Sequence, residues 1–275
     1  MTYATLMVHM ELGRSNAKLL SVVGDLAERF HAAVIGIAAC QSMPMVYGEG
    51  YVSAELIEQD RLGMQRELQK AEAELRSALA GRVGMLEWRS TSVFASLSDY
   101  IVREARSADL LITGAGQGDL FDASRALNMG DLLMHAGRPV LVVPAVVDQL
   151  QPNNVLVAWK DTRESRRAVC DALPLLRLAT EVCVVEVVSE DDAPSARLRV
   201  ADVAAWLQRH GVLATSIAAY SAADNATTLY SVAQERRADV IVAGAYGHSR
   251  LREWALGGMT RDLVNPTQRC SLVSH

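Results

Sequence analysis

Several features that mark particular protein classes are absent from this chain of 275 residues. No apolar run reaches the ~18 residues that a membrane-spanning helix needs, and no signal peptide opens the sequence. No block of lysine and arginine occurs, and the formal net charge is −5, which argues against nucleic acid as a partner. We therefore expect a cytoplasmic protein that contacts neither a membrane nor nucleic acid, whereas local backbone donors can still hold small anionic ligands.

The sequence also lacks the patterns that indicate metal binding or nucleophilic catalysis. Its cysteines are Cys40, Cys170, Cys183 and Cys270. They form no C-x-x-C motif and have no histidine at ligand spacing, so we interpret them as reduced packing residues and expect no metal site. No serine stands in a Ser-His-Asp arrangement. We interpret His9, at the end of the first predicted strand, as a packed or hydrogen-bonded residue rather than a base.

What the sequence does contain is an internal repeat. The segment RSADLLITGAGQG at Arg106–Gly118 recurs as RRADVIVAGAYGH at Arg236–His248. Each copy has the pattern of a helix end, an Ala-Asp step, a buried strand and a glycine-led turn. Similarly, RPVLVVP at Arg138–Pro144 corresponds to RCSLVSH at Arg269–His275. The chain is therefore predicted to be a tandem duplication of one α/β unit.

Both halves show the same alternation of strands and helices. The first half is predicted to contain strands Thr5–Met10, Ala33–Ala38, Leu86–Ser92, Leu110–Thr113 and Val140–Val143, with helices Ser15–His31, Ser53–Ala80 and Ser96–Arg106 and a short one near Leu132. The second half is predicted to contain strands Val155–Trp159, Val182–Val187, Ala214–Ala219, Val240–Ala243 and Ser271–Ser274, with helices Arg163–Leu176 (capped by Thr162), Arg197–His210, Thr227–Arg237 and Met259–Val264. This alternation predicts a parallel sheet covered on both faces.

The two halves are expected to pack closely, because the linker Ala145–Asn153 is short and polar. We place the domains at residues 1–146 and 153–275. Val140–Val143 and Ser271–Ser274 are equivalent terminal strands, and folded proteins usually cover such edges. We therefore expect these two strands to pair across a pseudo-twofold axis, which makes the chain an intramolecular pseudo-dimer. A homodimer of chains is a further expectation.

The candidate binding chemistry lies at Gly244–Thr260, which reads GAYGHSRLREWALGGMT. A glycine turn at the carboxyl end of a parallel strand lets backbone N–H groups approach phosphate oxygens. A second glycine pair, Gly257–Gly258, opens a helix and adds free amides and the positive end of the helix dipole. Thr260 is placed to donate its hydroxyl. These residues taken alone leave a second interpretation open, in which the glycines only turn the chain.

The spacing G-x-x-G-x9-G-(Ser/Thr), after a strand preceded by Ala-Asp, resembles the ATP-binding signature of the universal stress protein family. Gly244, Gly247 and Gly257 match this signature, and Gly258 stands where the family has Ser or Thr. The duplicated architecture is similar to the tandem universal stress proteins of bacteria. The resemblance implies an α/β fold with two tandem five-stranded parallel-sheet domains of the adenine nucleotide alpha hydrolase-like, Rossmann-like type. It also implies a stress-response binding or regulatory role.

Carried over residue by residue, the resemblance implies a site for ATP or another adenine nucleotide in the second half, with no cofactor required. The implied ligand-binding residues are Trp159, Lys160, Asp161, Val187, Gly244, Gly247, His248, Gly257, Gly258, Met259 and Thr260. The chain departs from the family at the end of the first strand of this half, where Lys160-Asp161-Thr162 replaces Asp-Gly-Ser. In one interpretation Asp161, one position further along, takes the role of the family's aspartate. Lys160 either reaches a phosphate or is a solvated loop residue.

The corresponding site in the first half is predicted to be degenerate. Gln117 occupies the second glycine position, and Ala126–Leu127 align with Gly257–Gly258. Asp119 and Asp122 add negative charge where phosphate would lie, and like charges repel. The strand-end motif is also lost here, since the sequence reads Met-Glu at positions 10 and 11. We therefore predict at most one nucleotide per chain.

Two alternative functions stay open. In one, the protein binds no nucleotide and acts through contacts with an unidentified protein partner. In the other, it is a slow ATPase, although no base or cluster of metal ligands is evident, so we expect a protein that is not primarily an enzyme.

The largest difference between the halves is the Met- and Tyr-containing loop Gln41–Val52. This loop either packs on the helix that follows it, or folds over a cleft or contacts a second chain.

Overall fold

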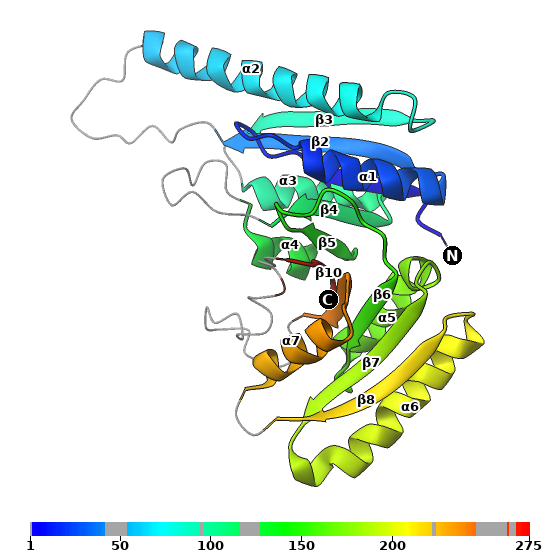
Figure 1. Ribbon diagram of the computed structural model, residues 1–275. Helices are drawn as coiled ribbons and strands as arrows, with labels where there is room; N and C mark the ends of the chain where they lie inside the picture. Colours follow the sequence, from blue (N-terminus) through cyan, green and yellow to red (C-terminus); the bar gives the residue numbers. More distant parts are fainter. Residues whose placement is uncertain are drawn as a thin grey trace, which may run out of the picture.

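The protein forms one continuous sheet of ten strands with helices on both faces, as a computed structural model shows (Figure 1). The structure describes residues 2–41, 54–93, 96–115, 127–221, 224–245, 263 and 268–275. The predicted α/β class is therefore confirmed. Gln41, predicted to begin a loop, is instead the last residue of strand β2 (Ala33–Gln41). The rest of the loop predicted over Gln41–Val52 and most of the helix predicted over Met259–Val264 lie outside the described residues.

The elements follow the predicted order closely in both halves. Those of the first half are β1 (Thr5–His9), α1 (Ala17–Phe30), β2 (Ala33–Gln41), α2 (Ala54–Leu79), β3 (Leu86–Val93), α3 (Leu97–Glu104), β4 (Leu110–Gly114), α4 (Met129–His135) and β5 (Val140–Val143). Those of the second half are β6 (Asn154–Ala158), α5 (Arg163–Leu176), β7 (Glu181–Val188), α6 (Ala193–Arg209), β8 (Ala214–Tyr220), α7 (Asn225–Glu235), β9 (Val240–Gly244) and β10 (Cys270–Ser274). Helix α6 begins earlier than predicted, because Pro194 is tolerated in a first helical turn.

The strand order is β3-β2-β1-β4-β5-β10-β9-β6-β7-β8, so each half contributes five adjacent strands. All pairs within a half are parallel, whereas β5 and β10 pair antiparallel, with Val140 opposite Val273 and Leu141 opposite Leu272. These strands lie at the centre of the molecule (Figure 1). The predicted pairing of the two terminal strands is therefore confirmed, and one half is related to the other by a pseudo-twofold axis.

The core lies in two layers, one on each face of the sheet. Residues of α1, α2, α5 and α6 pack in the layer on one face, and residues of α3, α4 and α7 pack in the layer on the other. The central strands are buried on both sides, as in parallel sheets generally, and Leu110, Ile112, Val240 and Val242 are fully buried. None of the described helices is both long and apolar enough to cross a bilayer.

The repeated Ala-Asp step has a structural role in both halves. Asp109 accepts hydrogen bonds from the N–H groups of Ala4 and Thr5 at 2.8 and 2.9 Å, and Asp239 accepts one from Asn154 N–H at 2.9 Å. Each aspartate thus fixes the first strand of its half to the strand that follows the step. The Ala-Asp part of the repeat therefore has a role in strand pairing in both halves.

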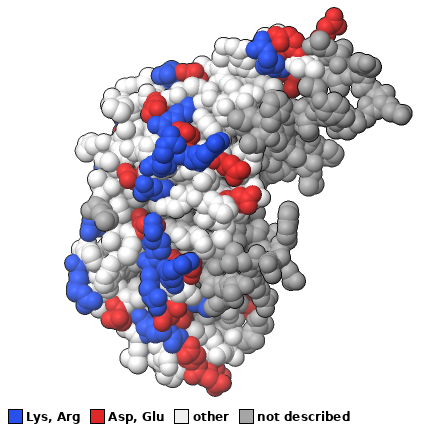
Figure 2. Space-filling model, turned by 180° about the vertical axis from the view of Figure 1, so that it is seen from behind, with Lys and Arg blue, Asp and Glu red and all other residues white. Residues whose placement is uncertain are grey.

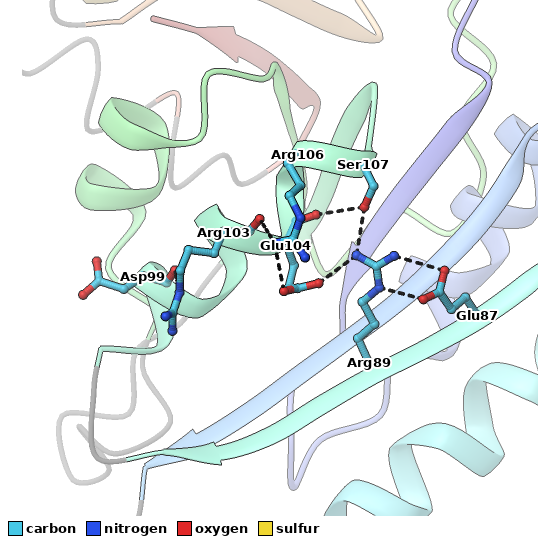
Figure 3. A network of polar contacts seen from close by, with 7 residues as sticks. All are labelled: Glu87, Arg89, Asp99, Arg103, Glu104, Arg106 and Ser107. Carbon is cyan, nitrogen blue, oxygen red and sulfur yellow. Dashed lines mark hydrogen bonds and ion pairs between the residues drawn. The ribbon is translucent and has the colours of Figure 1, made fainter.

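An ion-pair network joins the edge strand β3 to α3 (Figure 3). The guanidinium of Arg89 bonds to Glu87 and Glu104 at 2.8 Å each and donates to Ser107 Oγ at 2.8 Å. Arg106 bonds to the other oxygen of Glu104 at 3.2 Å. Charged side chains on an edge strand also disfavour pairing with another chain. On the face shown in Figure 2, Lys and Arg form a band, and Asp and Glu lie next to them within it.

The cysteines are all free thiols. Three of them are buried, as expected of packing residues, and burial raises the pKa of Cys270 to about 12. Cys170, however, is exposed on α5, so the packing interpretation is wrong for this residue. The error arises because Cys170 faces a gap between helices rather than the sheet.

Candidate functional site

The candidate site lies where β6 and β9 end side by side and α5 begins. Ala158 of β6 pairs with Ala243 of β9, so the residues that follow each strand emerge at the same edge of the sheet. Of the residues predicted to bind nucleotide, the structure describes Trp159, Lys160, Asp161, Val187 and Gly244. The others, which are Gly247, His248, Gly257, Gly258, Met259 and Thr260, lie outside the described residues.

Gly244 is in direct contact with the backbone of the first turn of α5. A Cβ atom added to Gly244 would lie 2.5 Å from Glu164 C and 2.5 Å from Ser165 N. Only glycine permits this approach of strand to helix, since the positions of these backbone atoms leave no room for a side chain. The end of β9 is thereby held against the amino end of α5, where the first amides of the helix lack partners within the helix.

The amino end of α5 is built by a cap and a serine. Thr162 Oγ1 accepts a hydrogen bond from Ser165 N–H at 3.3 Å, which confirms Thr162 as the predicted cap. Ser165 Oγ in turn accepts from Lys160 N–H at 3.3 Å. The loop between strand and helix is therefore tied to the helix itself. The Lys160 side chain is exposed above this loop.

Glu164, which the sequence analysis did not single out, lies in the same turn and is only 7% exposed. Burial raises the pKa of its carboxyl, but hydrogen bonds from its own backbone N–H and from Thr162, together with Arg163, hold that pKa below its ordinary value. The site thus contains a buried carboxylate that stays ionised. Its second position in a capped helix, directly beneath the strand-end glycine, is the signal that could have identified it.

The structure does not bring all of the described candidates together. Trp159 packs in the core layer of α5 and α6, and its indole Nε1 is buried without a hydrogen-bond partner among the described residues. Val187 is half-buried and packs in the layer on the opposite face. Asp161 is exposed and bonded to Arg166. Lys160 and Gly244 therefore lie at the shared edge, whereas Trp159 and Val187 lie on opposite sides of the sheet.

The equivalent place in the first half is filled by the chain's own carboxylate. A Cβ atom added to Gly114, at the end of β4, would lie 2.7 Å from Glu11 Oε1. Burial raises the pKa of Glu11, an effect that Arg14 opposes. Asn16 fixes the backbone of this loop, because its Oδ1 accepts from Glu11 N–H at 2.9 Å and its Nδ2 donates to Glu11 O at 3.0 Å.

Other candidates for chemistry in the first half have structural roles. His9 Nδ1 lies 3.1 Å from Thr113 Oγ1, and burial lowers the pKa of His9 to about 4, so the ring is neutral at pH 7. The interpretation of His9 as a packed, hydrogen-bonded residue is confirmed. Ser98 is buried and bonds to the backbone of Asn128 in both directions. No group of three potential metal ligands occurs in the part of the chain that the structure describes.

Neither a protein-family model nor a curated protein matches this sequence. Solved structures do match its fold. A universal stress protein from Archaeoglobus fulgidus aligns over 98% of this chain and 95% of its own, with a TM-score of 0.70 and 14% identity. A functionally unknown protein from Pseudomonas aeruginosa aligns over 99% of this chain and 92% of its own, with a TM-score of 0.60 and 16% identity.

A second universal stress protein from A. fulgidus aligns with only 45% of this chain while covering 98% of its own length, with a TM-score of 0.38 and 17% identity. At these identities the comparisons establish the fold alone. This chain has the α/β fold of universal stress proteins over nearly its whole length, arranged as two units that share one sheet.

Proposed function

We propose that this protein is a tandem universal stress protein whose second half binds ATP or another adenine nucleotide in a regulatory role. The domains proposed are residues 1–146, with a degenerate site, and residues 153–275, with the binding site. The proposal rests on the signature that begins at Gly244 and on the fold shared with a universal stress protein. A cytoplasmic location, a homodimer of chains and a protein partner stay predictions.

One observation carries the proposal: the strand-end glycines of the two halves face different atoms. Gly114 faces the Glu11 carboxylate, whereas Gly244 faces the backbone of the first turn of α5. A phosphate is repelled by a carboxylate in the first position, whereas the positive end of the α5 helix dipole attracts it in the second. This difference between the two glycines supports the asymmetry that we propose.

Polar groups around Gly244 suit the remaining parts of a nucleotide. In this proposal the exposed ammonium of Lys160 offsets phosphate charge, and the carboxylates of Asp161 and Glu164 accept hydrogen bonds from hydroxyl or amino groups of a nucleoside. Glu164 would take the acidic role that the family gives to the end of the first strand. Its buried, ionised state fits an acceptor, because a protonated carboxyl would itself need a partner.

The test is calorimetric titration of ATP into the full chain and two matched variants. Gly247→Asp should abolish binding, because it places a carboxylate and a Cβ against the phosphates. Gly118→Asp, the corresponding change in the first half, should leave the affinity unchanged. If the unmodified chain gives no heat of binding, the alternative of a protein-interaction module without nucleotide is favoured. Release of ADP after long incubation would instead support a slow ATPase.

A further inference from the structure

The second half contains a pocket of about 410 Å³ between α5 and α6, away from the pairing of the two halves. Its walls include Trp159 from the end of β6, Val169 and Cys170 from α5, and Val203, Trp206 and Arg209 from α6. The volume falls within the range of small-molecule sites, which is roughly 300–1,000 Å³.

The corresponding positions of α1 in the first half are covered. Leu20 is fully buried, and a Cβ atom added to Gly24 would lie 2.3 Å from Arg82 Nη1, so the Arg82 guanidinium covers this glycine. Arg82 also bonds to Asp25 at 2.8 Å and to Glu28 at 2.6 Å, which fixes it over the helix. In the first half, therefore, one of these positions of α1 is a buried leucine and the other lies under a fixed arginine.

Aligning the helix caps Asn16 and Thr162 places Arg166 and Cys170 opposite Leu20 and Gly24. Both Arg166 and Cys170 line the pocket. The buried leucine and the covered glycine of the first half thus correspond to an exposed arginine and an exposed cysteine in the second half. The pocket is a specific difference between two halves that otherwise share their architecture.

Two tryptophans give the pocket flat walls. Trp159 and Trp206 are two of the four tryptophans in the chain, and Val169 and Val203 add apolar surface beside them. The Trp206 ring is held by His210, whose ring centroid lies 4.2 Å away. Aromatic walls favour a planar ring as the occupant, because offset-stacked and edge-to-face contacts add to the gain from apolar burial.

The charges around the pocket favour one anionic group on that ring. The Arg166 guanidinium is bonded to Asp161, and that of Arg199 is bonded to Glu186 at 3.0 Å and to Asp192 at 2.6 Å. Arg209, in contrast, is exposed and has no ion pair with any residue that the structure describes.

Arg209 follows Trp206 by three residues on α6, so both side chains lie on one helix face. The carboxylate of Asp202 also lines the pocket, and it opposes a second negative charge on the occupant.

We infer that the pocket between α5 and α6 binds a planar aromatic molecule that carries a single anionic group, such as an aromatic carboxylate or sulfonate. The ring lies against Trp206 and Trp159, and the anion meets Arg209. Trp159 and Asp161 line this pocket and are also among the residues predicted to bind nucleotide. The inference does not rest on nucleotide binding, because Trp206 and Arg209, which the test changes, are not among those residues.

The test uses two fluorescent probes with the same rings: anilinonaphthalene sulfonate, which is anionic, and N-phenylnaphthylamine, which is neutral. The sulfonate probe should bind the native chain saturably. Trp206→Ala should weaken its binding by about tenfold or more, through loss of stacking and apolar contact. Arg209→Gln should weaken it by about three- to fivefold, the size expected of an exposed ion pair.

Matched controls separate the charge contact from general surface binding. Arg197→Gln changes an exposed arginine of the same helix that does not line the pocket, and it should leave the affinity unchanged. Arg209→Gln should leave the neutral probe unaffected. The inference is overturned if the sulfonate probe does not saturate, or if Arg209→Gln, which replaces an exposed side chain in a folded helix, binds it as tightly as the native chain.

Discussion

Replacing Gly244 with alanine is expected to destabilise the fold, whereas the same replacement at Gly114 is expected to be tolerated. The added Cβ at Gly244 meets backbone atoms of Glu164 and Ser165 at 2.5 Å, so α5 or β9 must move to accommodate it. At Gly114 the added Cβ meets Glu11 Oε1 at 2.7 Å, which is the end of a flexible side chain that rotates away. The two variants make the same chemical change at equivalent positions.

Overpacking against atoms that cannot yield costs about 1–3 kcal/mol. For chains of this size each 1 kcal/mol lowers the melting temperature by roughly 2–4 °C, so Gly244→Ala should lower it by roughly 2–12 °C. Gly114→Ala should change stability by no more than about 0.5 kcal/mol, because only a side-chain tip is displaced. Scanning calorimetry of the two variants and the parent chain measures this difference. Equal melting temperatures for the two variants would contradict an unyielding contact between Gly244 and the backbone of α5.

Three further predictions concern stability. Arg89→Met should lower the free energy of unfolding by about 1–2 kcal/mol in urea denaturation, because Glu104, whose side chain is only 17% exposed, loses its ion pair with Arg89. An unchanged denaturation midpoint would contradict a stabilising role for the network. His9 is neutral when folded with a pKa of about 4 against 6.5 when unfolded, so it contributes stability above pH 6.5 that is lost as the pH falls towards 4. His9→Gln should therefore show a smaller fall in melting temperature between pH 7 and pH 5 than the parent chain, and the exposed His135→Gln should fall as the parent does. Asp109→Ala should lower the free energy of unfolding by about 1–3 kcal/mol in the same denaturation assay, because the N–H groups of Ala4 and Thr5 lose their acceptor. A change below about 0.5 kcal/mol, the usual size for a surface substitution, would refute that role.

The strands could be predicted from sequence because buried parallel strands are short apolar runs bounded by turns. Val140–Val143 is a strand with the predicted bounds, and Val240–Ala243 is extended by one residue. The pairing of β5 with β10 also followed from the repeat, since two equivalent edges related by a twofold axis cover each other. The internal duplication therefore carried the information about global topology that a single unit would have lacked.

The environment of each glycine could not be predicted in the same way. Gly114 and Gly244 occupy equivalent places in the repeat, yet one contacts a carboxylate and the other a helix backbone. The difference depends on the path of the loop after the first strand of each half, which periodicity does not determine. The pocket beside Cys170 was missed for a related reason, because an apolar helix face does not reveal how closely a neighbouring helix approaches it.

The most direct test of the asymmetry between halves is the number of ATP molecules bound per chain, measured by native mass spectrometry under saturating nucleotide. Because Glu11 occupies the place next to Gly114, we predict a single adduct per chain, and Gly247→Asp should remove it. Two adducts of equal affinity would show that the first half also binds nucleotide, and the absence of any adduct would contradict nucleotide binding by the second half.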